Sequence, residues 1–270
     1  MAEIAEIKPW TTSTAGENLF LFLYKLVSPT IPNLNHEKGF FYSSLGLNEF
    51  FRLTATMEVM HRCLNTAIPL IEISPSVTSA RITEELKDAL PARPSNNQMQ
   101  LLGELTRLSA IAYVDQKLTE GMANSTHKNE KPDCCWCGKP TSRAKGTPQK
   151  DKSTVEHLWP EFLGGQSVEE NLIIACGECN GKRKHAFTWA WFGVQACNEK
   201  LDSNKSLPRE IKLSIGLHRL MKVASGQTRI SRERITLKDA ALRLRAIIPS
   251  VELLDETRYT FLEILDNATE

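Results

Sequence analysis

Apolar residues in the first part of the chain recur at intervals of three, four and seven, the spacing that places side chains on one face of a helix. Residues 45–68 show this pattern, and Pro69 is expected to end that helix because proline breaks the hydrogen-bond ladder. Two further apolar stripes predict two further helices. Their members are Ile82, Leu86 and Leu90 in the first, and Leu101, Leu105, Leu108 and Ala112 in the second. No run here alternates as a strand would, so residues 1–125 are expected to form a helical region.

Residues 120–133, EGMANSTHKNEKPD, contain almost no apolar side chains and are expected to form a linker. Helical patterns return after residue 185. They comprise the apolar segment 186–196, a segment beginning near Ser206 and ending at Gly226, a capping box of Thr236 with Asp239, and a short final helix at 255–265. We therefore expect a second helical region over residues 191–270.

The segment between these regions, residues 126–190, has a different pattern. STVEHLWP at 153–160 and LIIA at 172–175 are expected to form two short strands. Gly164 and Gly165 would supply the chain reversal between them, and a helix would begin near Asn180. The predicted fold is mainly α, with helical flanks around a small strand–strand–helix core.

Four of the seven cysteines lie in two CxxC pairs within this middle segment, Cys134 with Cys137 and Cys176 with Cys179. Two tight turns that each present two thiolates would complete a tetrahedral zinc site. A redox CxxC is the competing interpretation, but it needs a thioredoxin-like context that the sequence lacks. Cys135 could replace Cys134, although CxC spacing fits the turn less well. We expect structural zinc.

A zinc ion held by four thiolates has no open position for a substrate, so any chemistry must lie elsewhere. Between and beside the cysteine pairs lie four polar candidates for a reaction. They are Glu156, His157, Asn171 and Asn180. A neutral imidazole can act as a base near pH 7, and carboxylate and amide oxygens suit a hard divalent cation.

These residues resemble the HNH endonucleases, a family with a ββα-metal active site. The resemblance covers residues 134–185 and rests on an ordered set of features: Glu156-His157, Pro160, Gly164-Gly165, Asn171-Leu172, Cys176, Cys179, Asn180 and the basic run Lys182 to Lys184.

The resemblance implies that His157 is the general base and that Asn171 fixes the loop that orients it. It implies that Glu156 and Asn180 bind one catalytic divalent cation, Mg²⁺ or Mn²⁺, while the four cysteines hold Zn²⁺. Many family members have Asp where this chain has Glu156, and many have His where it has Asn180. The first difference could shift the cation, and the second favours magnesium over softer metals.

The resemblance also implies DNA as the substrate. Phosphate contacts are expected from Lys182, Arg183, Lys184 and His185, and from a basic zone at residues 219–245. That zone contains eight Lys or Arg residues and two acidic ones, although the whole chain carries a net charge of only +1. The alternative interpretation of the zone is a solvated helix face with scattered arginines.

The composition, with 41% apolar and 24% charged residues, is that of an ordinary globular protein. We expect a cytoplasmic location and no membrane association, because the sequence shows no secretory signal and no long apolar run. A catalytically silent zinc module that binds DNA or a protein is the alternative to a nuclease. By analogy with nuclease subunits of bacterial anti-phage systems, the partner could be an ATPase or a sensor protein, and the helical flanks could form a homo-oligomer.

Overall fold

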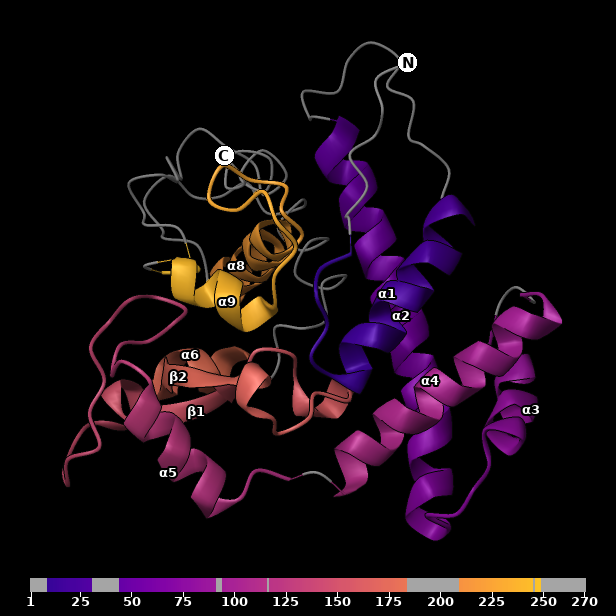
Figure 1. Cartoon of the computed structure of the whole chain (residues 1–270), viewed down its shortest axis with the longest axis horizontal. Helices are drawn as coiled ribbons and strands as arrows, with labels where there is room; N and C mark the ends of the chain where they lie inside the picture. Colours follow the sequence, from indigo (N-terminus) through magenta and orange to yellow (C-terminus); the bar gives the residue numbers. More distant parts are fainter. Residues whose placement is uncertain are drawn as a thin grey trace.

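The computed structural model describes residues 9–30, 44–90, 94–115, 117–183, 209–244 and 246–248. Its fold is mainly α, as predicted, with one two-stranded antiparallel sheet in the described residues (Figure 1). The helices are α1 (Ala15–Val27), α2 (Ser44–Ile73), α3 (Ser79–Ala89), α4 (Asn96–Asp115), α5 (Glu120–Asn129), α6 (Gly177–Arg183), α8 (Arg209–Ala224) and α9 (Leu237–Arg243). The strands are β1 (Ser153–His157) and β2 (Leu172–Cys176).

Helix α2 does not end at Pro69, which corrects the prediction made from the sequence. Pro69 lies inside the helix, and α2 continues to Ile73. A proline inside a helix costs about 3 kcal/mol because one hydrogen bond is lost and the ring meets the preceding turn. Ala67 and Ile71, on either side of the proline, are both fully buried. Packing of this last turn into the core therefore outweighs the local penalty.

Helix α4 forms where the apolar stripe predicts it, but only half of the stripe faces the core: Ala112 is buried and Leu105 packs against the core. Leu101 is 48% exposed and Leu108 is 42% exposed, whereas Leu102 and Met99 are buried. A Cβ atom added at Gly103 would lie 1.9 Å from the Thr83 side-chain oxygen. The lack of a side chain at Gly103 thus lets α3 and α4 approach closely, and that approach sets the rotation of α4.

Residues 120–133 are not a linker, because helix α5 occupies Glu120–Asn129. Thr119 caps the helix by accepting a hydrogen bond from the Met122 backbone, and Glu120 places a negative charge in the first turn. The helix contributes its Thr126 side to the interior, and His127 Nδ1 lies 3.3 Å from Ser153 Oγ on β1. A mostly exposed helix needs few apolar residues, so low hydrophobicity alone was a poor indicator of a linker.

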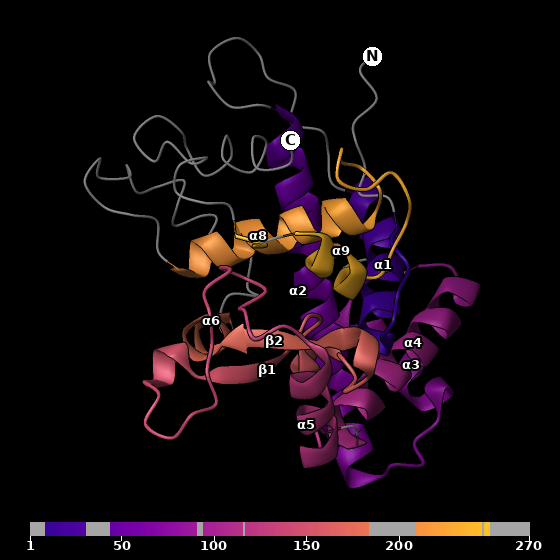
Figure 2. The same ribbon diagram turned by 60° about the vertical axis from the view of Figure 1, so that its left-hand side comes forward.

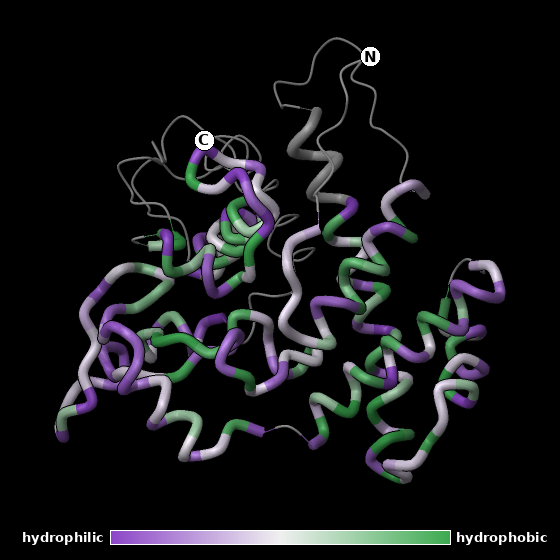
Figure 3. Tube along the Cα trace, in the orientation of Figure 1, coloured by the Kyte–Doolittle hydropathy of each residue, from purple (hydrophilic) through white to green (hydrophobic). Residues whose placement is uncertain are grey.

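The two predicted strands form one hairpin in which His157 pairs with Leu172 and Ser153 pairs with Cys176. Strand β2 is apolar along its length and buried at every position (Figure 3). Two views, Figures 1 and 2, show the hairpin between α5 on one side and the α8–α9 pair on the other. The hairpin is therefore enclosed by helices that come from both ends of the sequence.

Backbone hydrogen bonds tie the C-terminal part to the middle segment. Ile247 N–H donates to Cys135 O at 3.0 Å, and Ile248 N–H donates to Trp136 O at 2.7 Å. The predicted capping box of Thr236 with Asp239 is present at the start of α9. Buried residues from the N-terminal helices, the hairpin and α8–α9 belong to one continuous hydrophobic core. The predicted helices at 186–196 and 255–265 lie outside the described residues.

No helix in the described ranges is long and apolar enough to cross a membrane.

Candidate active site and zinc centre

The four predicted zinc ligands come together. Their sulfur atoms all lie within 4.8 Å of one another, and the Cys137 and Cys176 sulfurs are 4.0 Å apart. Tetrahedral zinc with Zn–S bonds of about 2.3 Å requires sulfur separations of about 3.8 Å, so the cluster has nearly the size of a zinc site. The Cys134 thiol lowers the pKa of Cys176 to about 7 by hydrogen bonding, and it also lowers the pKa of Cys137. Hydrogen bonding with Cys137 raises the pKa of Cys134, and hydrogen bonding with Cys134 raises the pKa of Cys179, so in the absence of a metal only part of the cluster is thiolate.

Local structure aims these sulfurs at one point. Gly138 adopts a left-handed conformation with φ of 70°, and its N–H donates to Cys134 O at 2.8 Å, which closes the first knuckle. The second pair lies at a junction of elements, because Cys176 ends β2 and Cys179 lies in the first turn of α6. The four-cysteine cluster thus connects the strand to the helix that carries Asn180.

Cys135 is not part of the cluster, which resolves the choice between Cys134 and Cys135. Its backbone N–H donates to Ile174 O at 3.0 Å, and burial raises the pKa of its thiol well above the usual value. All six cysteines in the described residues are free of disulfide bonds. This arrangement favours a metal centre over a redox CxxC pair.

Sequence reasoning missed one contact to the zinc centre. Arg209, the first residue of α8, donates to the Cys179 sulfur at 3.3 Å and lies 3.2 Å from the Glu178 carboxylate. A positive charge beside a thiolate stabilises the negative charge of a four-cysteine site. No spacing pattern could have indicated this pair, since 30 residues separate Arg209 from Cys179.

A separate pocket of about 250 Å³ lies between the hairpin and α6. Three of the four predicted reaction residues line it, namely Glu156 and His157 at the end of β1 and Asn180 on α6. Tyr113 and Phe162 contribute aromatic walls. The hairpin register and the helix that follows the second knuckle therefore bring together residues that are 24 positions apart.

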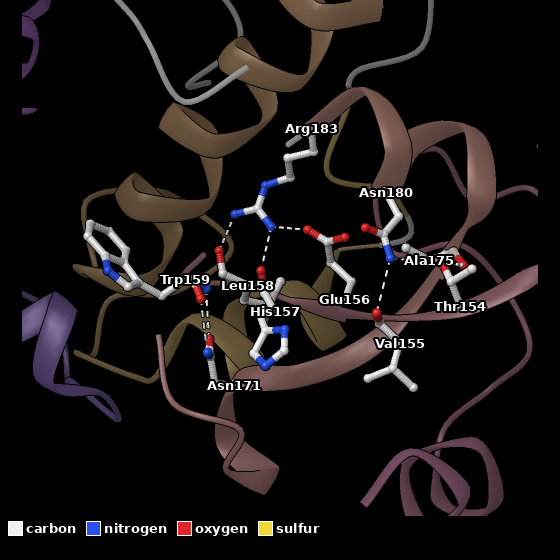
Figure 4. Close-up of polar contacts among 10 residues, drawn as sticks. All are labelled: Thr154, Val155, Glu156, His157, Leu158, Trp159, Asn171, Ala175, Asn180 and Arg183. Carbon is white, nitrogen blue, oxygen red and sulfur yellow. Dashed lines mark hydrogen bonds and ion pairs between the residues drawn. The ribbon is translucent and has the colours of Figure 1, made fainter. Parts of the chain in front are cut away.

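The orientation of the Asn180 amide is fixed. Its Nδ2 donates to Thr154 Oγ1 at 3.1 Å and to the Val155 carbonyl at 3.0 Å. With its nitrogen held against β1, the amide oxygen turns towards the Glu156 carboxylate, as Figure 4 shows. A carboxylate and an amide oxygen on the same side of the pocket form a donor set that suits a hard divalent cation.

Arg183 departs from the expected role of an exposed phosphate contact, because its side chain is only 4% exposed. The guanidinium forms an ion pair with Glu156 and donates to the carbonyl oxygens of His157 and Leu158 (Figure 4). It also lies 4.4 Å from the centre of the Trp136 ring. Arg183 thus closes the side of the pocket behind Glu156.

The imidazole of His157 has a specific partner. Its Nε2 lies 2.9 Å from Ser167 Oγ, and Ser167 is buried. Burial, assisted by the positive charge of Arg183, lowers the pKa of His157 to about 4, so the ring is neutral at pH 7. Ser167 was not singled out from the sequence, because a serine in a turn is common and carries no signal of its own.

Asn171 holds the turn between the strands. Its Oδ1 accepts from Trp159 N–H at 2.7 Å, and its Nδ2 donates to the carbonyls of Trp159 and Gln166, both at 3.0 Å. The side chain is buried. These three bonds connect the end of β1 to the segment that carries Ser167, and so they fix both members of the His157–Ser167 pair.

Comparison with known families identifies this arrangement. Residues 134–186 match the family model for HNH endonuclease. The chain carries an HNH endonuclease domain. Neither a curated protein nor a solved structure matches the chain. The HNH domain covers about a fifth of the sequence, and the helical regions lie outside the match.

The N-terminal helices contact the HNH domain at its interstrand turn. Gly16 N–H donates to Gly164 O at 3.0 Å, and Ala15 N–H donates to the Gln166 side chain at 2.8 Å. The Trp159 ring packs against Phe20 of α1 with a centroid distance of 5.2 Å. Helix α1 therefore supports the turn that positions the histidine.

The predicted basic residues divide into two groups. Arg219, Lys238 and Arg243 bond to neighbouring segments; Lys238, for example, lies 2.8 Å from Glu130, the residue that follows α5. Arg229, Arg232 and Arg234 are exposed, and so is Lys182 on α6. Lys184, His185 and Arg245 lie outside the described residues. Part of the basic zone is thus structural, which the charge pattern alone did not reveal.

Proposed function

We propose that this protein is a metal-dependent endonuclease that hydrolyses phosphodiester bonds of DNA. The observation that supports it most strongly is the pocket that Glu156, His157 and Asn180 line within an HNH domain. In this proposal Glu156 and Asn180 bind one Mg²⁺ or Mn²⁺ through their oxygens. The zinc centre is structural, since four thiolates leave no open ligand position.

His157 acts as the general base in this scheme. A base must be unprotonated at working pH, and the buried imidazole meets that condition. Ser167 and Asn171 restrict its orientation through the contacts described above. When bound, the divalent cation supplies charge neutralisation at the scissile phosphate and at the leaving oxygen. The proton of the attacking water passes to His157.

DNA binding is assigned to exposed positive charge around the HNH domain and on the 225–236 segment. Among the phosphate contacts predicted from the sequence, the exposed residues in the described ranges are Lys182, Arg229, Arg232, Arg234 and Arg243. Lys184 and His185 remain predicted phosphate contacts. Phosphate contacts release counterions, so affinity should fall steeply with salt concentration. A role in defence against phage, with an ATPase or sensor partner, remains a prediction from family resemblance.

One observation favours the alternative, a zinc module that binds nucleic acid or protein without catalysis. The carboxylate of Glu156 is buried and paired with Arg183, so one proposed metal ligand already has a counter-charge. The pocket argues against this alternative, because a purely structural module needs no carboxylate and oriented amide oxygen together in a pocket that a histidine also lines.

Cleavage of supercoiled plasmid by the purified full chain tests the proposal. We expect nicking with Mg²⁺ or Mn²⁺, none after their removal, and a loss of about 100-fold or more in His157→Ala. His127→Ala is the matched control, since His127 contacts Ser153 but does not line the pocket. Zinc content must be measured in each sample, so that chelation of the active-site cation is separated from loss of zinc. Equal nicking by wild type and His157→Ala would refute the proposed base.

A further inference from the structure

The pocket contains a permanent positive charge beside the proposed metal ligands. Arg183 pairs with Glu156, and both side chains are almost completely buried. A buried carboxylate without a counter-charge is strongly unfavourable, so in the metal-free protein Arg183 supplies the charge that Glu156 requires. A divalent cation that binds Glu156 would have to share this carboxylate with the Arg183 guanidinium.

The geometry allows both cations to reach Glu156 from different sides. Arg183 Nη1 bonds Oε1 of Glu156, whereas the amide oxygen of Asn180 lies on the other side of the carboxylate (Figure 4). A cation bound between Glu156 and Asn180 would therefore lie close to the guanidinium. Two positive charges would share one carboxylate that is almost completely buried, where their mutual repulsion is poorly screened.

Arg183 is also held firmly in place. Its guanidinium stacks on Trp136, which lies between zinc ligands Cys134 and Cys137, and α6 carries Cys179 in its first turn. The backbone carbonyls of His157, at the end of β1, and of Leu158, the next residue, accept further hydrogen bonds from it. Because these contacts oppose movement of the arginine, its charge stays near Glu156 when a metal binds.

We propose that Arg183 is the resident counter-ion of the metal site: it neutralises Glu156 in the metal-free protein and weakens the binding of the divalent cation. This inference rests on the metal site of the proposed function. Because coupling is reciprocal, the divalent cation weakens the Arg183–Glu156 ion pair as much as that ion pair weakens binding of the divalent cation. Replacing the guanidinium with a neutral side chain should therefore strengthen binding of the divalent cation. Arg183 thereby sets the metal concentration at which the pocket becomes occupied.

Titration of the zinc-loaded full chain with Mn²⁺, followed by calorimetry, tests the proposal. Arg183→Gln should bind Mn²⁺ about 10-fold more tightly than wild type, a typical size for coupling between two sites. Its thermal midpoint should be lower without Mn²⁺ and should rise more on Mn²⁺ addition than that of wild type. Arg183→Lys retains the charge and should lie nearer to wild type than to Arg183→Gln in Mn²⁺ affinity.

Two further variants separate the local effect from a general change of charge. Lys182→Gln makes the same charge change at the neighbouring exposed position and should leave Mn²⁺ affinity unaltered. The double variant Glu156→Gln with Arg183→Gln should show no gain, because the shared carboxylate is gone. Unchanged or weaker Mn²⁺ binding in Arg183→Gln would overturn the proposal, as would an equal gain in Lys182→Gln.

Arg183→Gln could also be unfolded in the absence of metal. Refolding at Mn²⁺ concentrations that do not affect Lys182→Gln would then support the proposal, and failure to refold would overturn it.

Plasmid cleavage separates this inference from the proposed function. Mn²⁺-dependent cleavage by wild type, together with unchanged Mn²⁺ affinity in Arg183→Gln, would overturn only the counter-ion role. A tenfold gain in affinity without any cleavage would overturn only the nuclease.

Discussion

Ser167 Oγ lies 2.9 Å from Nε2 of His157, although the two residues belong to opposite ends of the interstrand turn. The hydroxyl restrains one ring nitrogen and leaves the other as the candidate proton acceptor. The contact therefore determines which ring nitrogen of His157 is available to accept a proton in the reaction. The contact depends on a turn that is itself held by Asn171.

Removing the Ser167 hydroxyl should slow cleavage without unfolding the protein. In Ser167→Ala we expect kcat to fall about 10-fold with little change in KM, because the base loses orientation but remains neutral. Steady-state cleavage of a labelled duplex measures both constants. Ser125→Ala, at an exposed serine on α5, is the control and should retain wild-type kcat. A larger effect on KM than on kcat would argue against an orienting role.

Asn171 should make a large contribution to stability. Asn171→Ala removes three hydrogen bonds to backbone groups of buried Trp159 and half-buried Gln166, so we expect a loss of about 2–4 kcal/mol in the free energy of unfolding. Urea denaturation followed by tryptophan fluorescence measures the change. Asn124→Ala is the control, because this exposed side chain bonds only to Arg143 among the contacts described, and its effect should stay within about 0.5 kcal/mol. Similar losses in both variants would show that the three hydrogen bonds of Asn171 contribute no more to the free energy of unfolding than an exposed side chain does.

Local spacing made the four-cysteine cluster and the hairpin predictable. A CxxC pair requires only one turn to align its two thiols, and the Gly164 reversal shows the left-handed conformation that a glycine permits. The presence of the N-terminal helices was also predictable, from the spacing of the apolar residues. The extent of α2 beyond Pro69 and the exposure of Leu101 and Leu108 on α4 were not, because tertiary packing decided both.

Long-range partners were beyond the reach of sequence patterns. Arg183 resembled its basic neighbours in the sequence, yet it pairs with Glu156 across 27 positions while Lys182 faces solvent. Ser167 and Arg209 likewise act through residues distant in the chain. Each contact depends on how the strand register and α6 bring separate segments together, and a single sequence contains no signal for that geometry.

The zinc centre predicts a clear metal stoichiometry. Wild type should contain one zinc per chain, and Cys176→Ala should lose the metal and unfold the region that links β2 to α6, since metal binding supplies folding free energy there. Elemental analysis and circular dichroism measure the two effects. Cys135→Ala is the matched control from the same knuckle and should retain its zinc, because its sulfur lies outside the cluster. Loss of zinc in Cys135→Ala would require a different ligand set.

Gly16 tests whether the N-terminal helices and the HNH domain form one structural unit. A Cβ atom at this position would lie 1.9 Å from the Leu163 carbonyl oxygen and 2.4 Å from the Trp159 indole nitrogen. Because backbone atoms cannot yield as a flexible side chain can, Gly16→Ala should cost about 2–3 kcal/mol and reduce cleavage by displacing the turn that carries Ser167. Gly181→Ala is the matched control: an added Cβ meets nothing within 4 Å, and alanine is favoured in helix α6, so stability should be unchanged or rise by about 0.5–1 kcal/mol. If Gly16→Ala were as stable and as active as Gly181→Ala, α1 would not support the turn, and the two regions would have to be treated as independent.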